Sequence, residues 1–168
     1  DVTTFGKIIG GGLPIGAWGG KDELMALYDN ENNPAITHAG TFNANPPTMV
    51  AGEETLKQLT PEVIARMNGL GDQLRDKINA VFGELEMPGQ ATGVGSLFGI
   101  HFTDNEIVNY RDMLHGDQDL KTAFYTGMMN EGVLMFARAQ GAICTLTTER
   151  EVDDFVEASR NVFQRIRN

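Results

Sequence analysis

The chain has 168 residues, which is enough for one domain with its own core, and its apolar and charged fractions, 41% and 21%, are ordinary for a globular protein. Its formal net charge of −10 argues against nucleic acid and anionic membranes as partners, because both require basic surfaces. The single cysteine, Cys144, excludes an intramolecular disulfide and fits a reducing compartment, so we expect a cytoplasmic protein.

The first part of the chain, up to residue 59, combines short β-prone and glycine-rich segments with helices. Glycine alternates with apolar residues over 8–20, a run too short and too rich in glycine to span a bilayer or to favour a helix. The elements expected here are, in chain order, a strand at 3–7, turns and a short strand at 8–20, a helix at 21–28, a polar loop at 29–34, an irregular loop at 35–47 and a helix at 47–59.

The remainder of the chain alternates helices with short strands. Thr60 and Pro61 form a helix start, with Thr as N-cap and Pro at the first helical position. Thr148 and Glu151 have the spacing of a capping box, which opens the last helix. The expected elements are a long amphipathic helix from 61 to about 85, a strand at 94–102, a helix at 117–131, strands at 133–136 and 142–146 around a turn at 140–141, and a final helix from 149. This order predicts an α/β fold in which helices cover a small sheet.

Lys7 is the first candidate for chemistry. It lies among apolar and glycine residues, with no other charge between Asp1 and Lys21. Burial in such surroundings disfavours the charged form of a lysine and lowers its pKa. A neutral lysine is a nucleophile suited to a Schiff base with an aldehyde, and the neighbouring glycines let backbone approach a flat ring closely. The alternative is a surface lysine beside a glycine loop.

Two motifs carry a resemblance to a known family. The stretch Thr4-Phe-Gly-Lys7-Ile-Ile-Gly-Gly-Gly-Leu-Pro-Ile-Gly-Ala-Trp-Gly-Gly20 resembles the cofactor-lysine segment of class III aminotransferases, which are pyridoxal-phosphate (PLP) enzymes of fold type I. The stretch His38-Ala-Gly-Thr41-Phe-Asn-Ala-Asn-Pro46 is similar to their phosphate-contacting loop and lies at the expected distance downstream. The resemblance continues, less sharply, to the C-terminus.

The resemblance also implies a domain organisation. Residues 1–59 are expected to be the C-terminal part of the PLP-binding large domain, and 60–168 the C-terminal small α/β domain. Chains of the family are more than twice as long, so we expect this one to lack the N-terminal half and to be incomplete as an enzyme by itself.

Residue roles follow from the same resemblance. Lys7 is expected to hold PLP through a Schiff base and to move the proton during catalysis, and Thr41 is expected to donate to the phosphate, with Phe42 beside it. In the family this loop reaches the cofactor of the neighbouring subunit, which implies a homodimer with shared active sites. Arg138 is expected to bind the substrate carboxylate and Trp18 to line the substrate pocket. The alternatives are a turn threonine, a packed Phe42, a solvated arginine and a tryptophan that only fills space.

The implied reaction is transamination of an amine or amino acid with a 2-oxo acid or aldehyde. Within the family the alternative is glutamate-1-semialdehyde 2,1-aminomutase, which 95–104 and 110–112 resemble, whereas 41–45 are more similar to amine and β-amino-acid transaminases. A non-catalytic folded fragment, serving as a dimerisation scaffold, is the alternative from another class. The histidines do not cluster with carboxylates or the cysteine at metal-ligand spacing, so no metal site is predicted.

Overall fold

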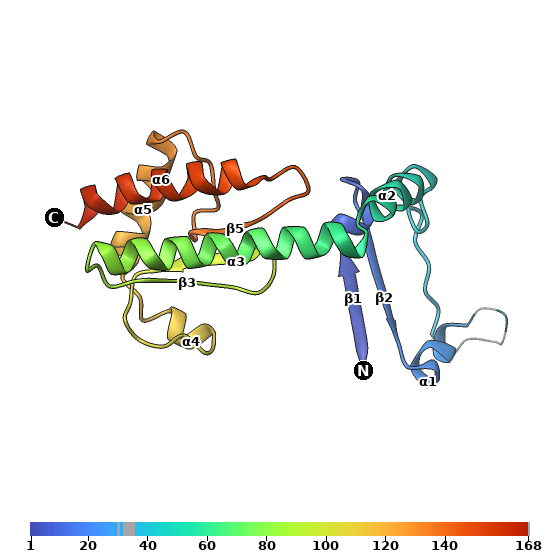
Figure 1. Cartoon of the computed structure of the whole chain (residues 1–168). Helices are drawn as coiled ribbons and strands as arrows, with labels where there is room; N and C mark the ends of the chain where they lie inside the picture. The colour runs from blue at the N-terminus through green and yellow to red at the C-terminus, as the bar shows by residue number, and fades with distance from the viewer. Residues whose placement is uncertain (30, 32–35, 168) are drawn as a thin grey trace. The chain divides into compact units, whose positions relative to one another are not determined.

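The computed structural model describes residues 1–29, 31 and 36–167, and the chain divides into two compact units, Asp1–Pro61 and Glu62–Asn168 (Figure 1). We call these the first and the second unit. The polar loop expected at 29–34 lies largely outside the described residues.

The first unit is built on a hairpin and a helix. Its elements are strands β1 (Val2–Gly6) and β2 (Gly16–Gly20), 3-10 helices η1 (Lys7–Gly10) and η2 (Ala26–Tyr28), and helices α1 (Asp22–Met25) and α2 (Pro46–Gln58). The two strands are antiparallel, with Val2 opposite Gly20 and Gly6 opposite Gly16. The strand predicted at 3–7 and the helices predicted at 21–28 and 47–59 are confirmed within one or two residues, apart from the switch to 3-10 geometry at Ala26.

Backbone, rather than apolar side chains, fills the interior of the first unit. Its only buried described residues are Gly10, Thr48 and Gly52. A Cβ atom on Gly52 would overlap with the carbonyl oxygen of Ile9, and one on Gly11, whose φ is +58°, would overlap with the carbonyl oxygen of Ala51. The turn after β1 therefore lies directly against α2, at a distance that only glycine permits.

The second unit contains a three-stranded sheet and four helices among its described residues. They are α3 (Pro61–Glu84), β3 (Gln90–Thr92), β4 (Leu97–His101), α4 (Tyr110–Met113), α5 (Gln118–Asn130), β5 (Gln140–Ala142) and α6 (Glu149–Ile166). The sheet has the order β3-β4-β5 and is antiparallel throughout. The predicted α/β fold, the three long helices and the central strand are confirmed, as is the capping box between Thr148 and Glu151.

Phenylalanine rings form the core of the second unit. Phe163 of α6 stacks on Phe82 of α3 and on Phe124 of α5, with ring centroids 4.5 and 5.0 Å apart. Phe102, just after β4, meets Phe163 edge-on at 5.8 Å. α3 and α6 lie side by side (Figure 1) and are also joined by ion pairs between Lys77 and Asp153 and between Arg160 and Glu84. The sheet and three helices thus share one apolar interior.

The segment 133–146 differs from the prediction. No strand forms at 133–136, where a single bridge joins Phe136 to Gln140, and the expected turn at 140–141 is instead part of β5. The cause is a tight turn in which the N–H of Ala139, at φ +56°, donates to the carbonyl oxygen of Phe136 at 2.9 Å. Leu134 therefore stays 84% exposed and Phe136 72% exposed, although both are apolar enough for a strand. The sequence analysis also missed β3 and α4, which are short.

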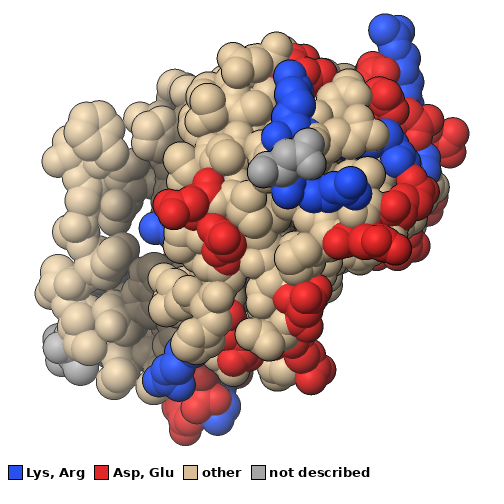
Figure 2. Space-filling view, turned by 90° about the vertical axis from the view of Figure 1, so that its left-hand side faces the viewer, with Lys and Arg blue, Asp and Glu red and all other residues tan. Residues whose placement is uncertain are grey.

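Charges of both signs are interspersed on the face of the molecule shown in Figure 2. An ion pair joins Arg165 of α6 to Glu131, and this hydrogen bond, with a second from Asn161, holds the pKa of the Glu131 carboxyl below its ordinary value. None of the helices formed by the described residues is long and apolar enough to cross a membrane. In the same part of the chain, no three His, Cys, Asp or Glu side chains are grouped so that they could hold a metal ion.

Candidate cofactor site

Lys7 stands at a strained position of the backbone. It is the first residue after β1 and has φ +53°, a left-handed conformation that costs about 1–2 kcal/mol in a residue with a side chain. Such strain persists where the surrounding structure imposes it, and it is common at functional sites. The side chain is exposed, and its amine has no hydrogen-bond or ion-pair partner among the described residues. The burial predicted for Lys7 from sequence is thus not provided by this chain's own residues.

An apolar pocket adjoins this lysine. It has a volume of about 490 Å³ and is lined by Lys7, Ile8, Gly12, Leu13, Pro14 and Ile15. This volume is within the range of small-molecule sites. The lysine is its only charged lining residue, so the pocket presents an amine at the edge of an apolar wall.

The lysine turn is held against the helix that follows the second motif. η1 and α2 approach through Gly11 and Gly52, as described above. At the start of α2, the side chain of Asn45 accepts a hydrogen bond from the backbone N–H of Thr48 at 3.4 Å. The structure therefore places the segment that carries the first motif against the helix that follows the second motif.

Thr41 lies at the tip of a turn just before α2. The N–H of Asn43 donates to the carbonyl oxygen of Gly40 at 3.0 Å, which leaves Thr41 and Phe42 at the two central positions. Both side chains are exposed, Phe42 to 82%. The Thr41 hydroxyl has no partner among the described residues, so it is available to donate to an anion.

Trp18 belongs to a cluster of three rings within the first unit. Its ring centroid lies 4.5 Å from that of Tyr28 and 5.8 Å from that of His38, while Tyr28 and His38 are 6.4 Å apart, all in edge-on geometry. The sequence analysis singled out Trp18 alone. Tyr28 and His38 were missed because no spacing rule links a strand, a 3-10 helix and a loop; the one signal was the position of His38 within the second motif.

Arg138 is in the second unit, whereas Lys7, Trp18 and Thr41 are in the first. It lies in the turn after Phe136, is exposed, and has no hydrogen-bond or ion-pair partner among the described residues. Its guanidinium group is thus available for a ligand.

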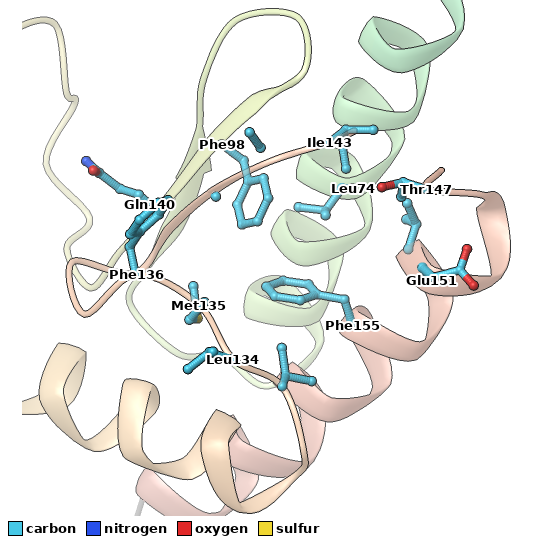
Figure 3. Close-up of a pocket in the computed structure, with 14 residues that line it drawn as sticks. Leu74, Phe98, Leu134, Met135, Phe136, Gln140, Ile143, Thr147, Glu151 and Phe155 are labelled. Carbon is cyan, nitrogen blue, oxygen red and sulfur yellow. The ribbon is translucent and has the colours of Figure 1, made fainter. Parts of the chain in front are cut away.

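The pocket shown in Figure 3 also belongs to the second unit. Its volume is about 520 Å³, and side chains of α3, β4, α6 and the segment 133–147 line it, including Leu74, Phe98 and Phe155. No predicted site residue is among its lining residues, so the candidate site rests on the first unit and not on this pocket.

His101 is a buried, hydrogen-bonded histidine of the second unit. It lies on β4 with 4% of its surface exposed, and its Nε2 is hydrogen-bonded to the hydroxyl of Thr92 at 3.0 Å. Its Nδ1 has no partner among the described residues. Burial, and secondarily the charge of Lys121, lowers the pKa of His101.

Comparison with known proteins identifies the family. The family model of class III aminotransferases matches residues 1–159. The chain belongs to this family. The chain is 38% identical over 168 residues to glutamate-1-semialdehyde 2,1-aminomutase of Bacillus subtilis (strain 168). The alignment covers 99% of this chain and 39% of that enzyme.

Two solved structures resemble this class III chain closely. An omega-transaminase from Sphaerobacter thermophilus superposes with a TM-score of 0.90 at 36% identity, over 100% of this chain and 39% of that one. A beta-phenylalanine aminotransferase from Variovorax paradoxus gives a TM-score of 0.92 at 34% identity, over 98% of this chain and 38% of that one. The fold is therefore that of a part of fold type I transaminases, and the chain spans about 39% of the length of the relatives it matches.

Proposed function

We propose that this chain is part of a longer PLP-dependent class III aminotransferase, in which Lys7 is the residue that binds the cofactor covalently. The observation that carries the proposal is the amine of Lys7, strained in φ, without a partner, and beside an apolar pocket of about 490 Å³. A ring with an aldehyde substituent and a phosphate fits this arrangement, because the amine of Lys7 and the apolar wall match the aldehyde and the ring, and the free Thr41 hydroxyl of a neighbouring copy of the chain matches the phosphate. Membership of the family supports the same cofactor.

In this proposal, different residues of the chain have different roles in cofactor binding and proton transfer. When bound, PLP supplies the electron sink for the amino transfer. Lys7 holds the cofactor and, once released, carries the proton at its Nζ. Thr41 and the N–H groups of its turn hold the phosphate, aided by the N-terminus of α2, a helix of 13 residues. Residues of the rest of the protein would complete the pocket and exclude water from Lys7.

Chemical trapping tests this assignment. The full-length protein is incubated with PLP, reduced with borohydride and digested, and the labelled peptide is identified by mass spectrometry. We expect the label on the peptide that contains Lys7 and its loss in Lys7→Ala. Lys21→Ala is the matched control, because Lys21 is exposed and forms an ion pair with Asp1, at 3.6 Å. A label on another peptide, or none, would overturn the proposal in favour of a non-catalytic scaffold.

We propose an amine or amino acid as amino donor and a 2-oxo acid or aldehyde as acceptor. The names of the two solved relatives, an omega-transaminase and a beta-phenylalanine aminotransferase, support this range at 36% and 34% identity. Ping-pong kinetics with a donor and an acceptor would bear it out.

Glutamate-1-semialdehyde 2,1-aminomutase is the second candidate, because the Bacillus subtilis enzyme of that name is 38% identical over nearly the whole chain. One assay distinguishes the mutase activity from the transaminase activity. Only the mutase should consume the semialdehyde without a second oxo acid, whereas a transaminase needs both partners.

Arg138 is proposed to bind the substrate carboxylate, since its guanidinium is exposed and without a partner among the described residues. Arg138→Ala should raise KM about tenfold or more for substrates with a carboxylate and leave KM unchanged for simple amines. Equal effects on both substrates would contradict this role.

We further propose a cytoplasmic homodimer with shared sites. The exposed position of the Thr41 turn supports a contact with a neighbouring subunit's cofactor. Mixing Lys7→Ala with Thr41→Ala subunits tests the sharing, because heterodimers would then regain one complete site and part of the activity. Three further statements stay predictions: that Trp18 lines the substrate pocket, that Phe42 lies beside Thr41 at the phosphate, and that the domain boundary falls between residues 59 and 60.

A further inference from the structure

The ring cluster of Trp18, Tyr28 and His38 joins the two motif segments in a way that the cofactor assignment does not use. Trp18 is on β2, Tyr28 ends η2, and His38 begins the motif that contains Thr41. They make the only ring–ring contacts among the described residues of the first unit. Because this unit buries no apolar side chain, three edge-on rings are a large part of what orders its loops.

His38 is linked to the Thr41 turn by a short chain of contacts. The side-chain N–H of Asn43 donates to Nε2 of His38 at 3.4 Å. The Asn43 side chain folds back over Gly40, where an added Cβ would lie 2.7 Å from its Oδ1. The backbone N–H of Asn43 closes the turn onto Gly40. The orientation of Thr41 is thus tied to the position of the His38 ring, both through this bond and through the backbone of the two residues that lie between them.

The ring contacts outweigh the hydrogen bond in this chain of contacts. The bond between Asn43 and His38 is long and exposed to water, so it contributes little. The two ring contacts of His38, at 5.8 and 6.4 Å, do not depend on the protonation state of one nitrogen. An aromatic ring of similar size should therefore replace His38 better than a small side chain would.

We propose that His38 is a positioning residue for cofactor phosphate binding: its ring, seated against Trp18 and Tyr28, sets the turn that presents Thr41 to the phosphate. The inference rests on the proposed function, and it assigns Trp18 a role in this cluster beside the substrate contact predicted from sequence. His38 itself touches neither substrate nor cofactor in this proposal.

Binding of PLP and of pyridoxal, which lacks the phosphate, to the full-length protein tests the inference. His38→Ala should weaken PLP binding about tenfold and leave pyridoxal binding unchanged, since only the phosphate contact is disturbed. Thr41→Ala should give the same phosphate-selective loss, and the double variant should be no weaker than Thr41→Ala alone. His38→Phe should restore most of the affinity. His115→Ala is the matched control, because His115 is an exposed histidine of the second unit.

The outcomes separate the two proposals. If the wild-type protein takes up neither aldehyde at Lys7, the proposed function fails. If it binds PLP normally but His38→Ala keeps the wild-type ratio of PLP to pyridoxal affinity, the positioning inference fails alone. Equal weakening of both ligands would reveal a general structural defect, and a His38→Phe variant as weak as His38→Ala would exclude the ring contacts as the cause. Either result overturns the inference.

Discussion

The two units of the chain are stabilised by different means. The second unit buries all of the apolar side chains that form a core among the described residues, with Ile78, Ile100 and Phe163 fully enclosed. The first unit buries two glycines and a threonine, and the close contacts between its lysine turn and α2 are made by backbone approaching backbone. It also holds Lys7 and Thr41, whose functional groups have no partner among the described residues.

This difference indicates a division of tasks. A domain gains most of its stability from apolar area removed from water, and the second unit has such an area of its own. The first unit has exposed polar groups and close contacts at glycine residues. Such contacts can position the side chains of a binding site, but they remove little apolar area from water. We infer that the second unit folds autonomously and that the first unit depends on the remainder of the protein.

Separating the units gives the largest expected effect. A polypeptide of residues 60–168, which keeps Thr60 ahead of α3, should unfold cooperatively and give dispersed amide resonances, because it retains the phenylalanine core. A polypeptide of residues 1–59 should do neither. Thermal unfolding by circular dichroism and a two-dimensional amide spectrum of each piece measure this. A folded first piece would remove the contrast.

Removing one core ring tests the same contrast within the intact chain. Phe163→Ala should lower the free energy of unfolding by about 3–5 kcal/mol, the usual loss for a buried phenylalanine, because this ring is 0% exposed and stacks on two others. Phe42→Ala removes the same atoms from a side chain that is 82% exposed. It should change the free energy of unfolding by less than about 0.5 kcal/mol. Urea unfolding measures both, and comparable losses would contradict the assignment of the core.

A glycine-to-alanine change should have opposite signs in the two units. Gly52→Ala in α2 should destabilise the full-length protein by about 1–3 kcal/mol, as overpacking does, because the new methyl group would meet the carbonyl oxygen of Ile9. Gly83→Ala in α3 has nothing within 4 Å of the added atom. It should stabilise the protein by about 0.5–1 kcal/mol through helix propensity. Urea midpoints of the two variants against wild type are the measurement; a Gly52→Ala variant as stable as wild type or more so would mean that η1 and α2 are not in close contact.

The smallest expected effect is the pH dependence of the second unit. Its interior lowers the pKa of His101 below the ordinary 6.5, first by burial and then by the charge of Lys121. The unfolded chain therefore binds the proton more readily than the folded chain does. The contribution of neutral His101 to the free energy of unfolding is fully present above about pH 6.5, and it is lost as pH falls through the lowered pKa. His101→Gln should flatten the dependence of the free energy of unfolding on pH between 7 and 5.

Exposed His115 supplies the comparison for this titration. His115→Gln makes the same substitution at an exposed position and is the matched control. If His115→Gln rather than His101→Gln removed the acid sensitivity, the buried histidine would not be its source.

Elements with strong local signals were predictable, and those that depend on distant partners were not. The capping box at Thr148 and the long apolar periodicity of α3 are local, and these helices are confirmed. The run 133–136 is also apolar, yet it forms no strand. A turn at Ala139 precedes Gln140, and the residues that pair with β4 are those from Gln140 onward. Sequence pattern reports what a segment can form, whereas pairing depends on which neighbour reaches it.

The candidate site divides in the same way. Lys7 and Thr41 were identifiable as residues of two motifs, but their exposed, partnerless state was not, and burial was predicted for Lys7 in error as far as this chain's own residues go. The ring cluster around His38 and the contact between Gly52 and Ile9 left no pattern to follow, because each joins residues from separate elements.

By itself, then, the sequence determined the helices, the α/β class, the two motifs and the family, since these depend on residue type and short-range spacing. Only the tertiary structure decided that one unit has a core and the other does not, and that the lysine turn rests on the helix after the threonine loop. The physical reason is that burial and close approach are properties of pairs of surfaces. Those surfaces meet only after the chain has folded.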